Sequence, residues 1–307
     1  MTRLAFAVVA ILAVNLSGAR GARAQGPESP DSTVVILLGT GTPVPDPNAA
    51  GPSTAVVVGK RLFVVDAGAG VMRRLSAAGF FAPPIEAVFI THLHSDHVLG
   101  YSDLIFTSWV FGREKPLQVY GPPGLQRMTD HLIAAFAEDI KIRTNGFERS
   151  TPNGYRVNAH EVKPGVIYDS AGVRVTAIPV LHGSWPYAYG YRFDTPTRSV
   201  VISGDTRESD AIAHAAAGVD VLVHEVVVLS ELGATPPGRF DGNIVRYMSS
   251  FHTPDKKLGE LAARAKPKLL VLSHIVPTGV ADSVLIAGIR SGGYTGKLAV
   301  GHDLDRY

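Results

Sequence analysis

The sequence predicts a single α/β domain in which two sheets pack together and helices cover their outer faces. Short apolar runs typical of buried strands come in two blocks along the chain, and each block is interleaved with helical patterns. The 307 residues are 46% hydrophobic and 18% charged, which is a globular composition with enough apolar material for a sizeable core. The chain shows neither an internal repeat nor, beyond its N-terminal segment, a low-complexity tract, so this pattern favours one domain.

The N-terminal segment, residues 1–24, is typical of a secretory signal peptide. Arg3 precedes an apolar run, and Ala22 and Ala24 place small residues at the −3 and −1 positions of a cleavage site. The run is too short to span a bilayer comfortably, although an uncleaved anchor is the alternative. Cleavage would remove three arginines and change the formal net charge from +2 to −1. We therefore expect a periplasmic or secreted protein with no stable membrane insertion after cleavage.

A Gly/Pro/Ser linker at residues 25–31 precedes the folded domain, which is expected over residues 32–307. Apolar runs predict strands at residues 34–38, 55–58, 62–65, 87–90, 173–180, 188–193, 199–203, 219–223 and 269–272. Helical patterns cover residues 98–111, 125–140, 208–217 and 254–265. Thr253 is a good N-cap for the last of these helices, with Pro254 in its first position.

Composition excludes several classes of chemistry. Cysteine is absent, so disulfides, thiolate metal sites and cysteine nucleophiles are ruled out. The 29 basic and 27 acidic residues are nearly balanced, which leaves no broad electrostatic footprint for nucleic acid. We therefore expect no nucleic-acid partner.

The residues that carry chemistry begin with a cluster that follows the strand at 87–90. His92 and His94 alternate in an extended segment, so their side chains can point the same way and share one metal ion. Asp96 and His97 start the next helix and can turn toward a second ion. Imidazole and carboxylate ligands suit zinc best here, and manganese or iron are compatible. The alternative is a polar loop with chance histidines, but burying so many titratable groups is costly without a metal.

Three later residues stand at the ends of buried strands and have the context of site residues. His182 precedes a glycine, Asp205 follows Ser203–Gly204, and His274 follows a serine. A carboxylate such as Asp205 can bridge two cations. Each histidine taken singly is more often a satisfied core or surface residue, so the argument rests on the whole set.

Together these residues resemble the metallo-β-lactamase superfamily. The run His92-x-His94-x-Asp96-His97 looks like its metal motif, and His182, Asp205 and His274 match its later motifs in order. The resemblance covers nearly the whole mature chain. It implies a four-layer αββα sandwich with two divalent ions at one edge. By this analogy one ion is held by His92, His94 and His182, the other by Asp96, His97 and His274, and Asp205 bridges the two.

The opening Gly39–Thr40–Gly41 segment and the full ligand set are similar to the ribonuclease Z-like, arylsulfatase and phosphodiesterase branch. Two further positions point the same way: His224–Glu225 resembles the branch's acidic motif, and Phe251–His252–Thr253 resembles its histidine loop. The resemblance implies that His252 protonates the leaving oxygen and that Glu225 orients it. Asp96 would orient the nucleophile while it ligates a metal.

The tRNA enzymes of this branch carry a long arm between the third and fourth motifs, whereas here His182 and Asp205 lie only 23 positions apart. With the signal peptide and the near-neutral mature charge, this spacing argues against tRNA 3′ processing. The expected function is therefore an exported, dinuclear metal-dependent hydrolase of a small phosphodiester or aryl sulfate ester.

Two other functions stay open at this point. The first is an acyl hydrolase acting on lactones, thioesters or β-lactams, because the same metal pair activates water for attack on acyl carbon. The second is a non-catalytic metal-binding protein. Homodimers are common in such families. Trp109, Phe111 and Trp185 with its neighbours at 186 and 187 are candidate pocket aromatics, unless they simply cover the core.

Overall fold

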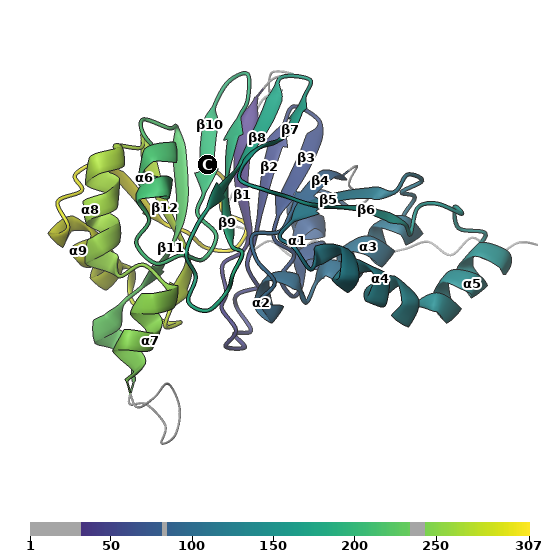
Figure 1. Ribbon diagram of the computed structural model, residues 1–307, viewed down its shortest axis with the longest axis horizontal. Helices are drawn as coiled ribbons and strands as arrows, with labels where there is room; N and C mark the ends of the chain where they lie inside the picture. Colours follow the sequence, from purple (N-terminus) through teal and green to yellow (C-terminus); the bar gives the residue numbers. More distant parts are fainter. Residues whose placement is uncertain (1–31, 82–84, 234–242) are drawn as a thin grey trace, which may run out of the picture.

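The computed structural model describes residues 32–81, 85–233 and 243–307 (Figure 1). The expected signal peptide and linker lie outside these residues. Within the described ranges, none of the helices combines the length and apolar character needed to cross a bilayer.

Two mixed sheets form the centre of the molecule, as the sequence predicts. The first sheet has the strand order β1-β2-β3-β4-β5-β6. Its strands are β1 (Thr33–Gly39), β2 (Ser53–Val58), β3 (Arg61–Val65), β4 (Ile85–Phe89), β5 (Leu117–Gly121) and β6 (Val157–Glu161). The second sheet has the order β13-β12-β11-β10-β9-β8-β7. Its strands are β7 (Gly165–Ser170), β8 (Val173–Pro179), β9 (Tyr189–Asp194), β10 (Ser199–Ile202), β11 (Val221–Val227), β12 (Leu269–Val276) and β13 (Lys297–Val300).

Helices flank the pair of sheets on both outer sides (Figure 1), which gives the four-layer αββα sandwich. On the side of the first sheet lie α1 (Val71–Ala77), α2 (Ser95–Val98), α3 (Tyr101–Val110), α4 (Leu125–Ala135) and α5 (Ala137–Asn145). The second half of the chain contributes α6 (Asp210–Ala215), a 3₁₀ turn (Leu229–Glu231), α7 (Ile244–Phe251), α8 (Asp255–Ala265) and α9 (Asp282–Ser291).

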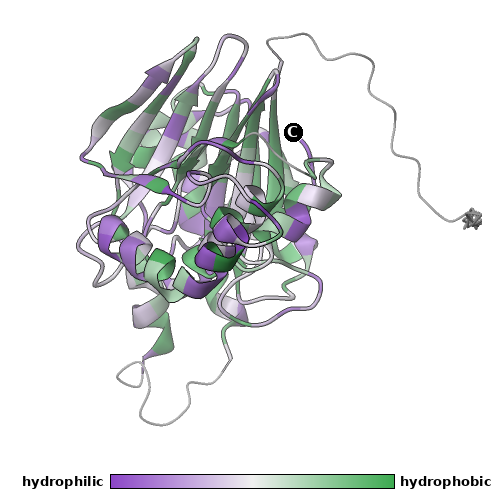
Figure 2. Ribbon diagram, turned by 90° about the vertical axis from the view of Figure 1, so that its right-hand side faces the viewer, coloured by the Kyte–Doolittle hydropathy of each residue, from purple (hydrophilic) through white to green (hydrophobic). Residues whose placement is uncertain are grey.

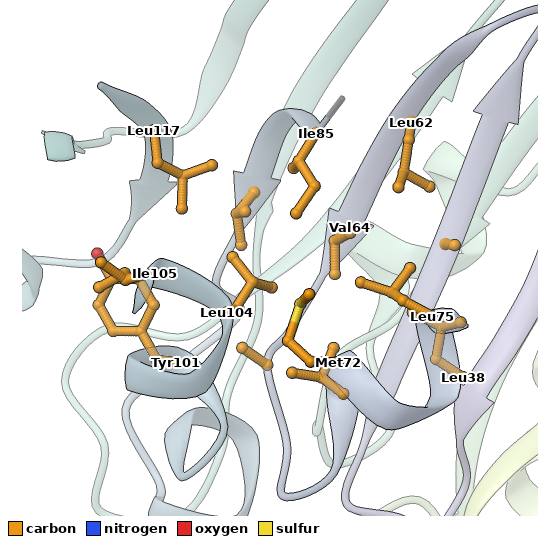
Figure 3. Close-up of a cluster of buried hydrophobic side chains, with 14 of the residues drawn as sticks. Leu38, Leu62, Val64, Met72, Leu75, Ile85, Tyr101, Leu104, Ile105 and Leu117 are labelled. Carbon is orange, nitrogen blue, oxygen red and sulfur yellow. The ribbon is translucent and has the colours of Figure 1, made fainter. Parts of the chain in front are cut away.

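The core has three buried layers that correspond to this arrangement. Between the sheets, alternate residues of the facing strands interdigitate, among them Phe63, Phe89 and Phe193. Outside the first sheet, Met72 and Leu75 of α1 and Leu104 of α3 pack on the strands (Figure 3). A third cluster lies under α6, α8 and α9. Because the strands are buried on both faces, they are green over much of their length in Figure 2 and read in the sequence as continuous apolar runs.

Every strand expected from an apolar run is present with somewhat shifted ends, but two of the expected helices are divided. The helix predicted at 98–111 is split into α2 and α3 around Gly100, whose N–H donates to the Ala67 carbonyl at 2.8 Å. A Cβ at this glycine would lie 2.2 Å from the Gly68 carbonyl oxygen, so the chain approaches the β3–α1 turn too closely for any other residue. The helix predicted at 125–140 breaks at Phe136 into α4 and α5.

The capping role expected for Thr253 is wrong. Thr253 is fully buried, and its hydroxyl donates to the Thr206 carbonyl at 2.7 Å rather than accepting from the helix. Helix α8 begins after it, at Asp255. Thr253 therefore ties the start of α8 to the segment that follows Asp205.

Several elements carry no clear signal in the sequence. Strands β6 and β7 are largely exposed at an edge of each sheet, and β6 is mostly polar while β7 has only the three apolar residues 166–168. Helix α7 follows residues outside the described ranges and has no buried residue. Strands β5 and β13 and helices α1 and α9 were likewise not predicted.

The C-terminal segment pairs with β1, which is an edge strand of the first sheet. The Val35 and Leu37 N–H groups donate to the Tyr307 and Asp305 carbonyls at 3.0 Å, and the Tyr307 N–H donates back to Val35 at 2.9 Å. Nearby, the Asp303 carboxylate accepts from the backbone N–H groups of Thr40 and Ala50, both at 2.8 Å. The last residues of the chain therefore hold the loop that follows β1.

Candidate metal centre and active site

The seven ligand candidates converge at one edge of the sandwich, because each follows or ends a strand that points there. His92 and His94 lie in the extended segment after β4, and Asp96 and His97 lie on α2. His182 follows β8, Asp205 follows β10, and His274 is in β12 with a left-handed φ of 48°. All seven are buried except His94, which is half-buried.

The first group comprises His92, His94, His182 and Asp205, whose ligand atoms all lie within 4.8 Å of one another. The Nδ1 atom of His94 is 2.9 Å from His92 Nε2 and 3.0 Å from His182 Nε2. Nitrogen ligands of a tetrahedral zinc ion are separated by roughly 3.3 Å, given Zn–N distances near 2.05 Å. The three imidazoles are therefore already close to the arrangement that a zinc ion requires.

The second group comprises Asp96, His97 and His274, also within 4.8 Å of one another. The Nε2 atom of His97 is 3.6 Å from Asp96 Oδ2, and His274 Nε2 is 4.0 Å from the same oxygen. His97 Nε2 is buried and makes no hydrogen bond. A buried polar nitrogen without a partner is costly, and a metal ion at this point would satisfy it.

One carboxylate oxygen connects the two groups. Asp205 Oδ2 lies 3.9 Å from His92 Nε2 and 3.8 Å from His182 Nε2 on one side. On the other side it lies 3.4 Å from His97 Nε2 and 3.1 Å from His274 Nε2. This position between two sets of nitrogen donors suits a bridging ligand of a two-metal site. The donor set is imidazole and carboxylate throughout, so the residues present fit a pair of divalent ions.

Outer partners turn the ligand nitrogens toward the centre. The Nδ1–H groups of His182 and His274 donate to the carbonyls of Phe251 and Gly41, each at 2.7 Å. His97 Nδ1 lies 2.8 Å from Asp66 Oδ2. In each case the other nitrogen, Nε2, is left to face the metal position, which is how metal-binding histidines are usually oriented.

Asp66 is a site residue that sequence reasoning missed. It follows β3 directly, is buried, and also accepts hydrogen bonds from the backbone and hydroxyl of Thr91 at 2.7 and 2.8 Å. The signal was available, since Asp66 is a carboxylate directly after a buried strand, as Asp205 is. It was overlooked because no second titratable residue stands next to it in the sequence.

The electrostatics of the cluster divide the histidines into two kinds. Burial lowers the pKa of His92 well below its ordinary value and lowers the pKa of His182 to about 4. Burial also acts to lower the pKa of His97 and of His274, but nearby carboxylates together raise both: Asp205 and Asp66 act on His97, and Asp205 and Asp96 act on His274. Burial opposes ionisation of Asp205, yet His274 and His97 hold its pKa well below the ordinary value. Without metal, His92 and His182 are thus held neutral, as metal ligands need to be, whereas His97 and His274 favour the protonated form beside the charged Asp205 and would release their protons when an ion binds.

A carboxylate–imidazole pair stands beside the ligands. The Glu225 carboxylate is buried, and its Oε2 lies 3.0 Å from His252 Nδ1 while its Oε1 accepts from the Thr253 N–H at 2.7 Å. A ring nitrogen of His252 lies within 4.8 Å of ligand atoms of Asp205 and His274. Because Nδ1 is engaged by Glu225, Nε2 is the nitrogen available to the site. His224, by contrast, is fully buried with Nε2 unpartnered and donates from Nδ1 to the Glu225 carbonyl.

The candidate pocket aromatics lie in different places in the structure. Trp109 is a core residue whose Nε1–H donates to the Thr151 carbonyl at 2.9 Å, so of its two predicted roles the structure supports covering the core rather than lining a pocket. Phe111 is exposed and packs edge-on against Phe81. Trp185 lies at the metal centre, where its Nε1 is 2.6 Å from His94 Nε2.

An open groove of about 530 Å³ reaches the centre at Asp96. Its walls are the proline-rich loop at residues 42–51 on one side and Ser95 and Leu99 on the other. A smaller cavity of about 40 Å³ lies behind the centre and is lined by Asp66, His97, Asp205, Glu225 and His274 among others. The groove therefore gives access to the centre next to one of the metal ligands.

The comparisons with known proteins agree with this geometry. Residues 61–275 match the family described as "Beta-lactamase superfamily domain", a range that includes all seven ligand candidates. Ribonuclease Z of Mycobacterium bovis (strain BCG / Pasteur 1173P2) is 36% identical over 277 residues, which are 89% of this chain and 96% of the relative. Ribonuclease Z of Mycobacterium sp. (strain KMS) is 39% identical over 245 residues, covering 79% of this chain and 84% of the relative.

A solved structure gives the same fold. Human tRNase Z, short form, superposes with a TM-score of 0.65 at 19% sequence identity, over 89% of this chain and 98% of the human chain. At this identity the likeness concerns the fold alone.

Proposed function

The chain belongs to the ribonuclease Z branch of the metallo-β-lactamase superfamily, and from this premise we propose that it is a metal-dependent ribonuclease that hydrolyses a phosphodiester bond of tRNA precursors. The observation that carries the proposal is the 36% identity to a ribonuclease Z over 96% of that relative's length. A match of this extent leaves no separate domain of the relative unaccounted for.

The expectation of a small ester substrate, with no nucleic-acid partner and no role in tRNA processing, is wrong, because the relatives that match over most of the chain are named Ribonuclease Z. Two of its premises were weak. Net charge averages over the whole surface, so a value near zero says little about the few groups that would contact RNA. The interval between His182 and Asp205 does hold only β9, β10 and their turns, but one short interval does not decide how RNA is held elsewhere.

Two divalent ions, for which we propose zinc, would supply Lewis acidity and lower the pKa of a water molecule to roughly 7. His92, His94 and His182 would hold one ion, Asp96, His97 and His274 the other, and Asp205 both. Asp96 would in addition accept a hydrogen bond from the nucleophile, because its carboxylate lies next to the open groove.

His252 would act as the general acid. Because Nδ1 is engaged by Glu225, Nε2 is the nitrogen that can carry a transferable proton, and a ring nitrogen of His252 lies within 4.8 Å of ligand atoms of Asp205 and His274, so this proton can pass to the oxygen that leaves phosphorus. Glu225 fixes the orientation of the ring by its 3.0 Å hydrogen bond to Nδ1. The same geometry would also suit a metal ligand, since ligating histidines often carry a carboxylate partner. Metal analysis of the His252→Ala variant separates the two roles, because a ligand's loss lowers the metal content.

The direct test uses zinc-loaded protein and a tRNA transcript with a 3′ extension. We expect cleavage at one position, together with much slower cleavage of an unstructured RNA of equal length. A mature tRNA transcript serves as the control and should stay intact. Failure to cleave the extended transcript at physiological salt, with two metal equivalents bound, would refute the proposal.

A further inference from the structure

Two aromatic side chains enclose the His94 imidazole, the one ligand that is only half-buried. The Trp185 ring meets it edge-on, with centroids 4.9 Å apart and an interplanar angle of 82°. Phe251 is stacked against the same imidazole, with centroids 6.2 Å apart and an interplanar angle of 26°. Tyr247 extends this surface from α7, with its ring centroid 4.6 Å from that of Phe251. An aromatic surface therefore adjoins the metal centre at its most accessible ligand.

The turn after β8 sets the position of the indole. Trp185 N–H donates back to the His182 carbonyl at 3.0 Å, so the chain reverses within three residues of a metal ligand. Gly183 makes this possible, because its φ is 52° and a Cβ there would lie 2.1 Å from the Phe251 ring. The residues on either side of Trp185 are exposed, whereas Trp185 is half-buried. The turn thus presents the indole over the centre while its own backbone stays at the surface.

The hydrogen bond between Trp185 and His94 is incompatible with metal binding by His94. Its Nδ1 faces His92 and His182, at 2.9 and 3.0 Å, and is the atom that would ligate the ion. A neutral imidazole that ligates through Nδ1 carries its proton on Nε2. Indole Nε1–H can only donate, so it cannot bond to a protonated Nε2 from 2.6 Å. Metal loading must therefore release the indole from His94, and its ring becomes available to another group.

We propose that Trp185 contacts the substrate, and that its indole stacks against the nucleobase next to the scissile phosphate. This inference rests on the proposed ribonuclease function. A phosphate held between the two ligand groups places the adjoining nucleotide beside His94, where the surface offered is aromatic. Stacking on an aromatic ring tolerates any base, since every base has a π face. Trp185 would accordingly position the cleaved bond without reading sequence.

The test compares Trp185→Ala and Trp185→Phe with wild type on 3′-extended tRNA transcripts. Each transcript carries either an ordinary nucleotide or an abasic ribose at one of the two positions flanking the cleaved bond. At one of these positions the base should matter: Trp185→Ala should raise KM roughly 5- to 150-fold for the base-bearing transcript and leave kcat much less changed. The abasic ribose should raise the KM of wild type to a similar extent. Trp185→Ala combined with the abasic transcript should raise KM little beyond either change alone. Trp185→Phe should restore most of the affinity.

The matched control is Phe111→Ala, because Phe111 is an exposed aromatic residue that lies outside the centre and packs on Phe81. Its KM should equal that of wild type on every transcript. A second readout is indole fluorescence in the slow His252→Ala variant loaded with zinc. Titration with the base-bearing transcript should quench it, and the added substitution Trp185→Phe should remove that response.

The outcomes distinguish the two proposals. If wild type cleaves the transcripts but Trp185→Ala loses the same factor on base-bearing and abasic RNA at both positions, Trp185 only supports His94 and the inference fails. A quench that survives Trp185→Phe leads to the same conclusion. If wild type with two metal equivalents cleaves no transcript, the ribonuclease proposal fails and the inference fails with it.

Discussion

Replacing His252 by alanine tests the proposed mechanism most directly, because it separates proton transfer from metal binding. General acid catalysis typically contributes about 10²–10⁴-fold to the rate, which corresponds to roughly 2.7–5.4 kcal/mol of the barrier. We expect His252→Ala to lose this factor in kcat on a tRNA precursor and to keep two metal equivalents. Bis(p-nitrophenyl) phosphate, used as a probe, should lose much less, because p-nitrophenolate leaves without a proton.

The structure also allows the loss of rate on replacing Glu225 to be estimated. Its Oε2 makes a 3.0 Å hydrogen bond to His252 from a side chain that is only 2% exposed, so the charge on this carboxylate is poorly screened. Hydrogen bonds to charged groups contribute about 1.5–3 kcal/mol. Glu225→Gln keeps the shape but removes the charge, so we expect a loss of roughly 10- to 150-fold on the tRNA precursor, at 1.36 kcal/mol per tenfold.

The assay is kcat for the tRNA precursor and for the p-nitrophenyl probe, measured in parallel with zinc content. His131→Ala is the matched control, because His131 is an exposed histidine on α4. Equal losses on both substrates would remove His252 from proton transfer. A fall in bound zinc would make His252 a ligand instead.

Further predictions follow from the ligand set, the buried histidines and the N-terminal segment. Purified protein should carry about two equivalents of zinc by elemental analysis. The Asp205→Ala variant should lose one of these equivalents and its activity. An unchanged zinc content in this variant would show that Asp205 is not a bridging ligand. In metal-free protein, burial lowers the pKa of His182 to about 4. As the pH falls, His182 therefore becomes protonated in the unfolded chain before it does in the folded chain. The free energy of unfolding should therefore drop by about 3 kcal/mol between pH 6.5 and pH 4 on account of His182, at 1.36 kcal/mol per pKa unit. Urea unfolding of His182→Gln, with His131→Gln as control, should show a correspondingly smaller drop. Finally, mass spectrometry of protein expressed from the full sequence should find a mature chain that begins at Gln25, and an intact N-terminus would favour the anchor.

The elements that could be predicted from the sequence are those whose burial produces a recognisable pattern of apolar residues. Strand β1 and the first three residues of β11 are covered on both faces, and each therefore appears as a short apolar run. Strand β6 at the sheet edge has no such run, because half of its environment is solvent. Helix α3 was placed correctly only in its body, since its start at Gly100 depends on a contact with the β3–α1 turn that no local pattern encodes.

The residues of the candidate site likewise fall into those that could be predicted from the sequence and those that could not. The ligands were found because strand ends gather at one edge and several of the ligands stand close together in the chain. Asp66 and the Gly41 carbonyl were missed, because their roles arise from contacts across 31 and 233 positions. The substrate was misjudged for a different reason. Net charge is summed over the whole chain, and the length of one loop concerns a single segment, so neither describes the surface beside the metals.

The pairing of the last residues with β1 has a consequence for handling the protein. Without residues 301–307, β1 would present unpaired N–H and C=O groups along a mostly apolar strand, which is the type of edge that recruits other chains into aggregates. The same deletion would remove Asp303, which holds Thr40 next to the Gly41 carbonyl that orients His274. A purification tag fused directly to Tyr307 would crowd this edge, so a tag separated from Tyr307 by a long spacer should give more soluble protein with its full metal content.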